Sequence, residues 1–498
     1  LLSIVRVGIN DDFFSLGGDS ILIIKLSSSI YSNLSVKLSI SDLFKNKTIS
    51  LISKLIYNQN KDSSSLSDLH LMINKCKNDS SYQLSFAQER LFFLCEFDSN
   101  ANKAYNIPFL LKIKKISESI SSSIRNQKLI IYKAFILLIK RHEILRTLIK
   151  EDEMKSNELR QFILNEKEAE EMLSYNEEEV ENKKELNQKL VQLFNYQFNL
   201  RSELPLKIVL YENKEDHEHI FVFILFHHIC CDGWSSNVFL RDLQTYYDHL
   251  NKNQDDMNNV NLPLLDIQYK DYSLWQREYL SGERLNSLIE YWLNKLNDYE
   301  VLNLRIDSES RPTHFDYTGR DLYFELDEET SMKLKQIAKR LNVSLFSLLL
   351  SAFSLMLSSF TNQDDIIIGT PVANRNQHEI ENLIGFFINM IVLRVKINNE
   401  FTLSDYIKSV SDEVIQSQIN QELPFERLVK EMKVVKNTSM NPIFQVAFLM
   451  NDQFINKTKE NDSNKFKIEP INQEESCVAL YDLTVSINES DHIIKGSF

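Results

Sequence analysis

The chain has 498 residues, 43% of them hydrophobic, which is enough for two or three domains with buried cores. A formal net charge of −14 without a dense Lys/Arg cluster argues against a nucleic-acid-binding surface. The five cysteines include no CxxC pair, which argues against a disulfide framework or a zinc site and favours a reducing, cytoplasmic setting. No uninterrupted apolar run of membrane-spanning length occurs, so we expect no membrane segment.

The predicted elements change character along the chain. Short helices come first, and they are predicted at 21–30, 41–44 and 49–57. A polar segment rich in Ser, Asn, Lys and Asp follows. Long helices then alternate with buried strands. The helices are predicted at 127–142, 329–341 and 345–360, and the strands at 219–226, 365–369 and 392–397. The acidic stretch 166–185 is interpreted as a solvated helix face or a loop.

A glycine-rich loop, Leu16-Gly17-Gly18-Asp19-Ser20, precedes the first predicted helix. Two glycines permit a tight turn, and a serine at a helix start exposes its hydroxyl where the helix N-terminus favours a phosphate. The sequence Gly-Gly-Asp-Ser alone could also belong to an ordinary loop whose serine is the N-cap of the helix. The longer pattern Asp-x-Phe-Phe-x-Leu-Gly-Gly-Asp-Ser-Ile resembles the carrier domains of nonribosomal peptide synthetases. The resemblance implies that Ser20 carries the cofactor 4′-phosphopantetheine.

His227 and His228 follow the predicted buried strand at 219–226 and begin an HHxxxDG pattern that ends in Asp232-Gly233. A strand end presents a base rigidly, and histidine can take up and return a proton near neutral pH. Asp232 can fix the loop through an ion pair, and Gly233 lets a backbone N–H approach a substrate or an oxyanion. A His-His pair alone could also be two structural imidazoles. No third ligand lies at a spacing that would predict a metal site.

The HHxxxDG pattern resembles the active-site motif of condensation domains, which belong to the chloramphenicol acetyltransferase-like superfamily. Six further stretches follow the order of the family's other motifs. They lie at 85–94, 141–147, 269–275, 384–389, 423–429 and 441–446, and a Tyr-Asn-Ile-Pro stretch follows the first at 105–108. Most of these stretches would be weak signals alone. Because seven motifs occur in order, the region from residue 83 onward is identified as a member of this family.

The resemblance implies a multidomain α+β fold. We expect a partial carrier bundle at 1–58 with its first helix truncated, and a linker at 59–82. Two chloramphenicol acetyltransferase-like lobes should follow as a V, an N-lobe at 83–255 and an incomplete C-lobe at 256–498. The last strands of the C-lobe are expected to be largely missing. The reaction site should lie between the lobes, with His228 near the floor of the cleft.

The resemblance also implies the reaction, an acyl transfer in which the amine of one carrier-bound group attacks the thioester carbonyl of another. His228 would orient the amine or accept its proton, with His227 in support, and the Gly233 amide would help to stabilise the oxyanion. The expected function is therefore carrier thiolation and amide-bond formation.

Two further residues receive supporting roles from the resemblance. Arg375 is expected to form an ion pair with Asp232, and Asn389 is expected to line the tunnel. Cys230 and Cys231 are interpreted as packing residues, because a thioester is already activated and needs no further nucleophile.

Other activities of the same family remain open. An epimerisation domain shares HHxxxDG and often follows a Gly-Gly-Asp-Ser carrier, although the first, fifth and seventh motifs favour condensation. Dual epimerisation/condensation and an inactive docking module are further alternatives, whereas a heterocyclisation domain would replace the two histidines by aspartates. The implied partners are upstream and downstream carrier and adenylation domains and a phosphopantetheinyl transferase, with no nucleic acid and no membrane.

Overall fold

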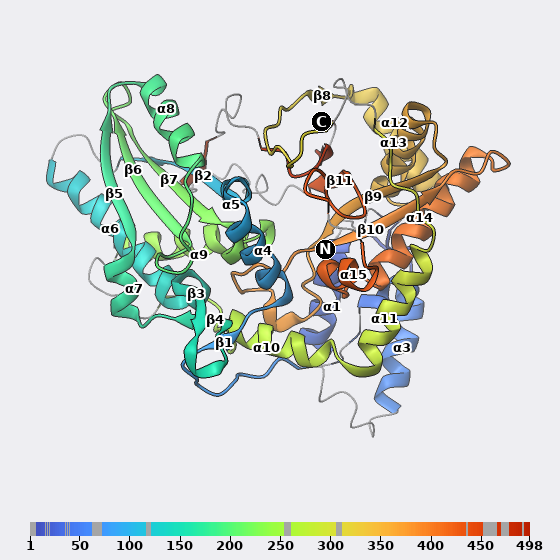
Figure 1. Cartoon of the computed structure of the whole chain (residues 1–498), viewed down its shortest axis with the longest axis horizontal. Coiled ribbons are helices and arrows are strands. Elements are labelled where there is room, and N and C mark those ends of the chain that lie inside the picture. The colour runs from blue at the N-terminus through green and yellow to red at the C-terminus, as the bar shows by residue number, and fades with distance from the viewer. Residues whose placement is uncertain are drawn as a thin grey trace.

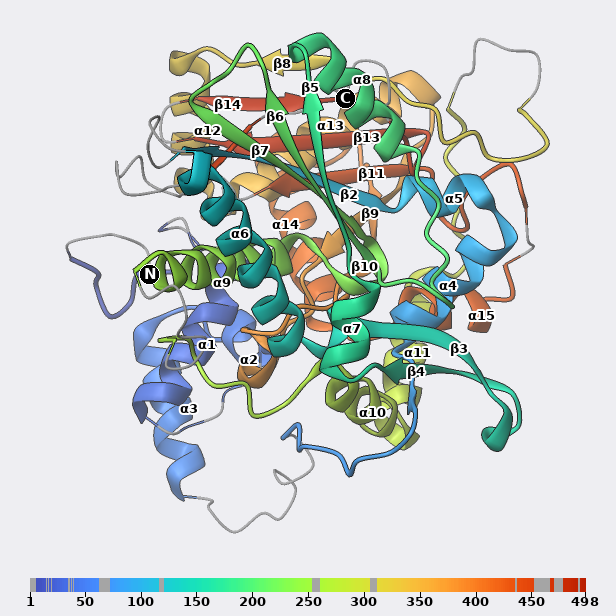
Figure 2. The ribbon, with the colours of Figure 1, turned by 90° about the vertical axis from the view of Figure 1, so that its left-hand side faces the viewer.

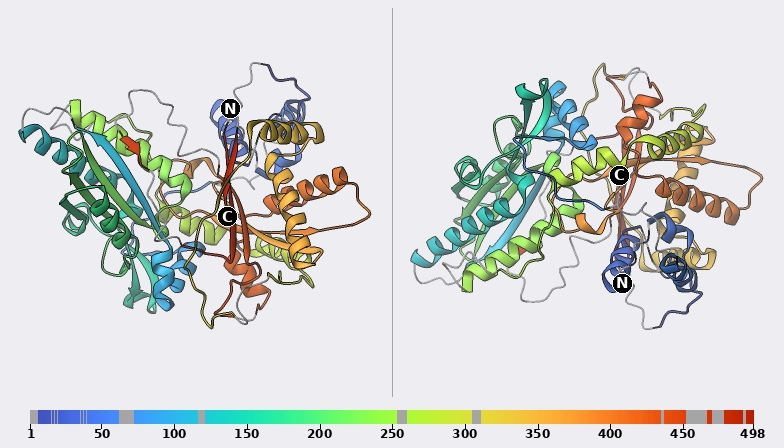
Figure 3. Two further views of the ribbon diagram at one scale, coloured as in Figure 1. Left: turned by 90° about the horizontal axis from the view of Figure 1, so that it is seen from above. Right: turned by 90° about the horizontal axis from the view of Figure 1, so that it is seen from below.

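The computed structural model describes two α/β lobes and a group of three helices (Figure 1). The described residues are 6–14, 16, 18, 20–34, 36, 38, 40–61, 72–115, 121–252, 260–304, 311–434, 437–451, 466–469, 478–490 and 493–498. Gly17 and Asp19 of the glycine-rich loop lie outside this set. In Figure 3 the lobes diverge as the arms of a V, as the family resemblance implies.

The first lobe is built on a five-stranded sheet of order β5-β6-β7-β2-β12, in which only β5 and β6 run parallel. Its central strand β7 is an almost continuous apolar run because it is buried nearly throughout. The strands are β2 (Asn106–Lys114), β5 (Ser174–Val180), β6 (Leu206–Asn213), β7 (His219–His227) and β12 (Phe466–Ile468). A smaller sheet beneath comprises β1 (Tyr82–Gln83), β4 (Glu158–Ile163) and β3 (Thr147–Asp152).

Helices cover the first sheet, with α6 packed against α9 and α8 in contact with β5, β6 and β7 (Figure 2). The helices of this lobe are α4 (Phe86–Phe97), α5 (Ser99–Ala104), α6 (Ser121–Arg141), α7 (Glu166–Met172), α8 (Lys183–Phe194) and α9 (Gly233–Lys252). Short 3-10 turns occur at Glu143–Arg146, Glu153–Lys155 and His228–Cys230.

The second lobe contains a six-stranded mixed sheet of order β10-β9-β11-β13-β14-β8, with β9, β11 and β13 parallel. Its strands are β8 (Tyr323–Glu325), β9 (Asp365–Val372), β10 (Asn389–Lys396), β11 (Val446–Asn451), β13 (Leu483–Glu489) and β14 (Ile494–Ser497). Its helices are α10 (Tyr269–Tyr279), α11 (Gly282–Lys295), α12 (Glu328–Leu341), α13 (Leu345–Thr361), α14 (Leu403–Ile419) and α15 (Phe425–Glu431), and a 3-10 turn lies at His378–Ile380.

The two lobes exchange segments. β12, which lies far downstream in the chain, pairs antiparallel with β2 of the first lobe. Tyr269 and Tyr272 of α10, together with Ile384 and Phe387, are part of the first lobe's apolar core. Because parts of the second half pack into the first lobe, a division near residue 255 describes the chain order but not the packing.

The three N-terminal helices are α1 (Ser20–Leu34), α2 (Ile40–Lys45) and α3 (Ile49–Lys61), and they lie against the second lobe (Figure 1). Their core is small, as expected for a short unit, and is formed by Ile23, Ile30, Val36, Leu38 and Leu43. This core continues into the larger domain, because Trp234, Ala373, Ile415 and Ile419 pack against it.

Most predicted elements occur within a few residues of their expected positions, but two expectations are wrong in part. The acidic stretch 166–185 contains strand β5 between α7 and α8, whereas we expected a helix face or a loop. Two strands, β13 and β14, follow Tyr481, although the last strands were expected to be largely missing. Within the described residues no single helix is long and apolar enough to cross a membrane. The bent pair α12 and α13 reaches that length and apolar character only when the two helices are taken together.

Candidate active site

The sheet of the first lobe holds the His-His pair in place. β7 ends at His227, and the chain turns at once into the 3-10 helix that begins with His228. The backbone N–H of His228 donates to the carbonyl of Tyr105 at 2.8 Å, and its carbonyl accepts from the N–H of Cys231 at 3.2 Å. These two bonds fix the backbone of His228 at the end of a rigid strand.

His227 is a buried side chain in the first core. Its Nδ1 accepts from the N–H of Ile229 at 3.2 Å, and its Nε2 lies 3.5 Å from the thiol of Cys95. Burial lowers the pKa of His227 to about 3, with a small contribution from the neighbouring His228. This neutral, fully enclosed imidazole supports the turn, and His227 is not among the residues that line the pocket beside His228.

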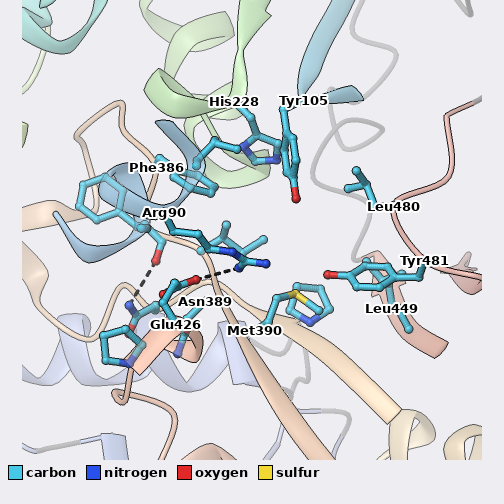
Figure 4. Close-up of a pocket in the computed structure, with 18 of the residues that line it drawn as sticks. Arg90, Tyr105, His228, Phe386, Asn389, Met390, Glu426, Leu449, Leu480 and Tyr481 are labelled. Atoms are coloured by element: carbon cyan, nitrogen blue, oxygen red, sulfur yellow. Dashed lines mark hydrogen bonds and ion pairs between the residues drawn. The ribbon is translucent and has the colours of Figure 1, made fainter. Parts of the chain in front are cut away.

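His228 points the other way, into a pocket of about 190 Å³ between the lobes (Figure 4). Its ring is flanked edge-on by Phe386 at 4.9 Å and Tyr105 at 6.1 Å between ring centroids. Its Nδ1 has no hydrogen-bond partner among the described residues. Burial lowers the pKa of His228, and the charge of Asp232 offsets this only in part. The imidazole is therefore neutral near pH 7 and able to accept a proton.

Asp232 turns away from the pocket and binds Arg375 of the second lobe, with Oδ1 3.1 Å from Nη2. Oδ1 also accepts from the N–H and the hydroxyl of Ser235, and Oδ2 accepts from the N–H of Phe387 at 3.0 Å. Burial would raise the pKa of Asp232, but Arg375 and these hydrogen bonds lower it below its ordinary value. We call Asp232, Ser235 and Arg375 the interlobe latch.

Arg375 completes the latch from the second lobe. It is fully buried, donates through Nη1 to the carbonyls of Ile380 and Leu383, and lies 4.0 Å above the ring of Phe387. A buried guanidinium with several fixed acceptors has only one favourable position. The latch therefore holds the segment that contains Phe386 against the loop that contains His228.

Gly233 and Asn389 were also predicted as site residues, and their surroundings differ from those of His228. Gly233 begins α9, is exposed, and is not among the residues that line the pocket. Its oxyanion role stays a prediction. Asn389 lines the pocket, but its amide donates to the carbonyls of Gln421 and Leu423 and accepts from the N–H of Phe425. The Asn389 side chain thus supports the loop before α15.

Among the polar residues of the pocket lining that were not predicted as site residues, four lie together: Arg90, Tyr105, Glu426 and Tyr481. Arg90 comes from α4, which begins at a capping box formed by Ser85 and Gln88. Its Nη1 donates to Oε1 of Glu426 at 2.7 Å. Tyr105 and Tyr481 complete the set (Figure 4). Arg90 and Glu426 lie in two of the seven family motifs, and Tyr105 begins the Tyr-Asn-Ile-Pro stretch. The motifs therefore identified these segments of the chain but not the part that these side chains play in the pocket.

The start of α1 suits the expected phosphodiester. Ser20 is the first residue of this 15-residue helix, where backbone N–H groups favour a phosphate. Gly18, two residues earlier, bonds through its N–H to the carbonyl of Phe13, and an added Cβ would meet the Phe13 ring at 2.3 Å. At position 18, two residues before the helix, the space therefore admits only glycine.

Residues 78–498 match the family model described as the condensation domain, and residues 2–56 match the phosphopantetheine attachment site. The chain belongs to the condensation-domain family of nonribosomal peptide synthetases. The three N-terminal helices are thus its carrier region with a phosphopantetheine attachment site, and the two lobes form its condensation-family domain.

Curated relatives are several-fold longer than this carrier and condensation region. An N-(5-amino-5-carboxypentanoyl)-L-cysteinyl-D-valine synthase of Amycolatopsis lactamdurans is 34% identical over 445 residues, which cover 89% of the chain and 11% of the synthase. Surfactin synthase subunit 1 of Bacillus subtilis is 30% identical over 493 residues, which cover 99% of the chain and 12% of the subunit. The chain therefore spans about an eighth or less of these relatives.

Solved structures share the fold of the condensation-family domain at low identity. The X-domain from teicoplanin biosynthesis has a TM-score of 0.71 at 19% identity, covering 86% of this chain and 91% of that one. A four-domain nonribosomal peptide synthetase bound to AMP and glycine has a TM-score of 0.68 at 21% identity, and the match covers 85% of this chain and 31% of that one. The epimerization domain from the third module of tyrocidine synthetase B has a TM-score of 0.64 at 15% identity, and the match covers 85% of this chain and 92% of that one. The fold is common to domains with different names, so the fold alone does not identify the reaction.

Proposed function

We propose that this protein forms an amide bond between two carrier-bound acyl or aminoacyl thioesters, with His228 as the base that positions the attacking amine. The observation that carries the proposal is the orientation of His228. Its neutral imidazole faces a pocket between the lobes, while Asp232 of the same motif is fully engaged in the interlobe latch.

The chemical step needs few groups. The amine nitrogen of the acceptor attacks the carbonyl carbon of the donor thioester, the C–N bond forms, and the C–S bond breaks. The proton lost by the amine passes to His228 and leaves with the departing thiolate as a thiol. Holding both reactants in one small pocket accounts for much of the expected rate enhancement.

We further propose that Ser20 bears the 4′-phosphopantetheine arm, whose terminal thiol supplies the thioester when it is loaded. The residues present fit this group, because Ser20 begins a helix and follows a glycine turn. Arg375 and Asp232 would act only by holding the pocket wall, and His227 only by supporting the turn.

Epimerisation is the second candidate, because a solved epimerization domain shares the fold and the family resemblance implies HHxxxDG for epimerisation domains as well. The two reactions differ in the bond that changes. Condensation forms a C–N bond and leaves the donor Cα–H intact, whereas epimerisation removes and returns that hydrogen.

One experiment separates the two. Ser20 of the full chain is loaded by a phosphopantetheinyl transferase from an aminoacyl-coenzyme A, and an aminoacyl carrier protein is added in D₂O. Mass spectrometry should show a dipeptidyl thioester on the added carrier without deuterium at the donor Cα. Deuterium incorporation without dipeptide would instead establish epimerisation, and neither product would support an inactive docking module.

A further inference from the structure

The pocket beside His228 is lined by apolar and polar residues, and four of the polar ones form one wall. The residues of that wall are Arg90, Tyr105, Glu426 and Tyr481, and we call them the polar subsite. The surrounding lining includes Leu91, Phe386, Met390, Leu449 and Leu480. Figure 4 shows the hydroxyls of both tyrosines directed toward the guanidinium of Arg90. Four polar groups from four separate segments thus converge on one part of the cavity.

Arg90 and Glu426 form the charged half of the polar subsite. Their ion pair at 2.7 Å joins α4 of the first lobe to α15 of the second. Both side chains keep solvent access, 31% and 25%, because they face the pocket. Nη1 of Arg90 is bound to Glu426, and no other hydrogen bond of this guanidinium occurs among the described residues. Arg90 therefore presents further N–H donors to whatever enters the pocket.

Tyr105 and Tyr481 form the neutral half. Within the described part of the chain neither hydroxyl has a hydrogen-bond partner, although both side chains line the pocket. Burial raises the pKa of both phenols, and the nearby charge of Arg90 does not outweigh it. Both hydroxyls are therefore protonated and available as donors near neutral pH.

The tyrosines are held in place by their backbones. The carbonyl of Tyr105 accepts from the N–H of His228. The residues on either side of Tyr481 are fixed as well, since the Leu480 carbonyl accepts from Asn441 and Asp482 pairs with Arg311. Unpaired hydroxyls on a fixed backbone are typical of groups arranged for a ligand.

No hydrogen bond among the described residues joins the polar subsite to the imidazole of His228. The subsite is thus a neighbour of the base and not part of a relay through it. Its composition is donor-rich, with guanidinium N–H groups and two hydroxyls against one carboxylate. The complementary ligand group is an oxygen with free lone pairs.

We propose that the polar subsite recognises a carrier-bound side chain that ends in a carboxamide or carboxylate oxygen, with Arg90, Tyr105 and Tyr481 as the hydrogen-bond donors. The inference rests on the proposed function for its location, since a carrier-bound group must reach His228. A side chain with an apolar end would leave these donors buried without partners, which disfavours it. The oxygen can belong to the donor or to the acceptor group.

Binding measurements test this without turnover. The probes are pantetheine amides of glutamine, glutamate and leucine, in which an amide replaces the reactive thioester. N-acetylated probes represent the donor, and probes with a free amine represent the acceptor. Each is titrated into the full chain by NMR, and into the Tyr105→Phe, Tyr481→Phe and Tyr279→Phe variants. Tyr279 lies outside the pocket lining and serves as the matched control.

With either the donor or the acceptor probes, glutamine or glutamate should bind at least about fivefold tighter than leucine, as expected for hydrogen bonds that leucine cannot make. Tyr481→Phe and Tyr105→Phe should each reduce this ratio severalfold and leave leucine binding unchanged, whereas Tyr279→Phe should alter neither. A ratio near one in the parent protein with both probe types would overturn the proposal, and so would a ratio that both subsite variants retain. Loss of amide formation in the same preparations would refute the proposed function but would not change these ratios, so the two failures are distinguishable.

Discussion

Asp232 and Arg375 are 143 positions apart in the sequence and 3.1 Å apart in the structure, and both are buried. Their ion pair joins the loop after β7 to the segment that carries Phe386 and Phe387. Both segments contribute residues to the pocket lining, so the ion pair holds two sides of the pocket together.

Replacement of Asp232 by Asn should strongly destabilise the domain. The substitution keeps the side-chain size but leaves the Arg375 guanidinium buried without its counter-charge, and such losses cost about 3 to 5 kcal/mol of unfolding free energy. Urea denaturation of the full chain measures this difference. An exposed pair provides the control, because Glu329→Gln removes a contact to Lys333 at the surface and should change stability by less than about 0.5 kcal/mol. Equal effects of the two substitutions would contradict the role of the latch.

Gly385→Ala should damage the same wall by steric overlap. An added Cβ at Gly385 would lie 2.1 Å from the Tyr269 ring, whereas an added Cβ at Gly233 would meet nothing within 4 Å. Overpacking of this kind costs about 1 to 3 kcal/mol, and Gly233→Ala should be neutral or slightly stabilising because Gly233 begins a helix. Thermal unfolding and amide-forming rates of both variants check this. A Gly385→Ala protein as stable and active as the parent would show that the wall can move.

The acid stability of the protein should depend on His227. Its pKa is about 3 in the folded state, so the unfolded chain binds one more proton between pH 6.5 and 3. Stability from this group is therefore complete above pH 6.5 and decreases by up to about 1.4 kcal/mol per pH unit as the pH falls toward 3. His227→Gln should reduce this slope. Urea unfolding at several pH values measures it, and an unchanged slope would show that His227 is protonated in the folded protein.

The contact between the carrier helices and the second lobe should speed transfer from Ser20. Ile415 and Ile419 on α14 pack against the carrier core. Ile419→Asp should reduce single-turnover transfer from the attached carrier by about tenfold, which corresponds to the loss of one partly buried aliphatic contact. Leu403→Asp, at the exposed start of the same helix, should have no effect. Equal rates in both variants would mean that the carrier reacts from another position.

Local patterns predicted the strands and helices that are strongly apolar. The run at 219–226 became β7 because a buried central strand needs apolar residues on both faces. Strand β5 was missed because it is an edge strand with three consecutive glutamates, Glu177 to Glu179, and its clearest apolar signal is Val180 at its end.

The contents of the site were predictable only in part. The expected pair of Asp232 and Arg375 is present in the structure, and the prediction came from the family pattern, not from any local signal. Arg90 and Glu426 lie 336 residues apart, and no periodicity in either helix indicates that they meet. Such partners are defined by the way two lobes pack, which local sequence patterns do not encode.

Single-turnover synthesis shows whether His228 serves as the base for amide formation. The full chain is loaded on Ser20 and mixed with an aminoacyl carrier protein, and dipeptidyl thioester is measured by mass spectrometry for the parent, His228→Ala and Cys231→Ala. His228→Ala should lower the rate by about 100-fold or more, because the variant lacks the base. Cys231→Ala, with a buried packing residue changed, should retain activity. Equal rates for His228→Ala and the parent would show that His228 is not the base.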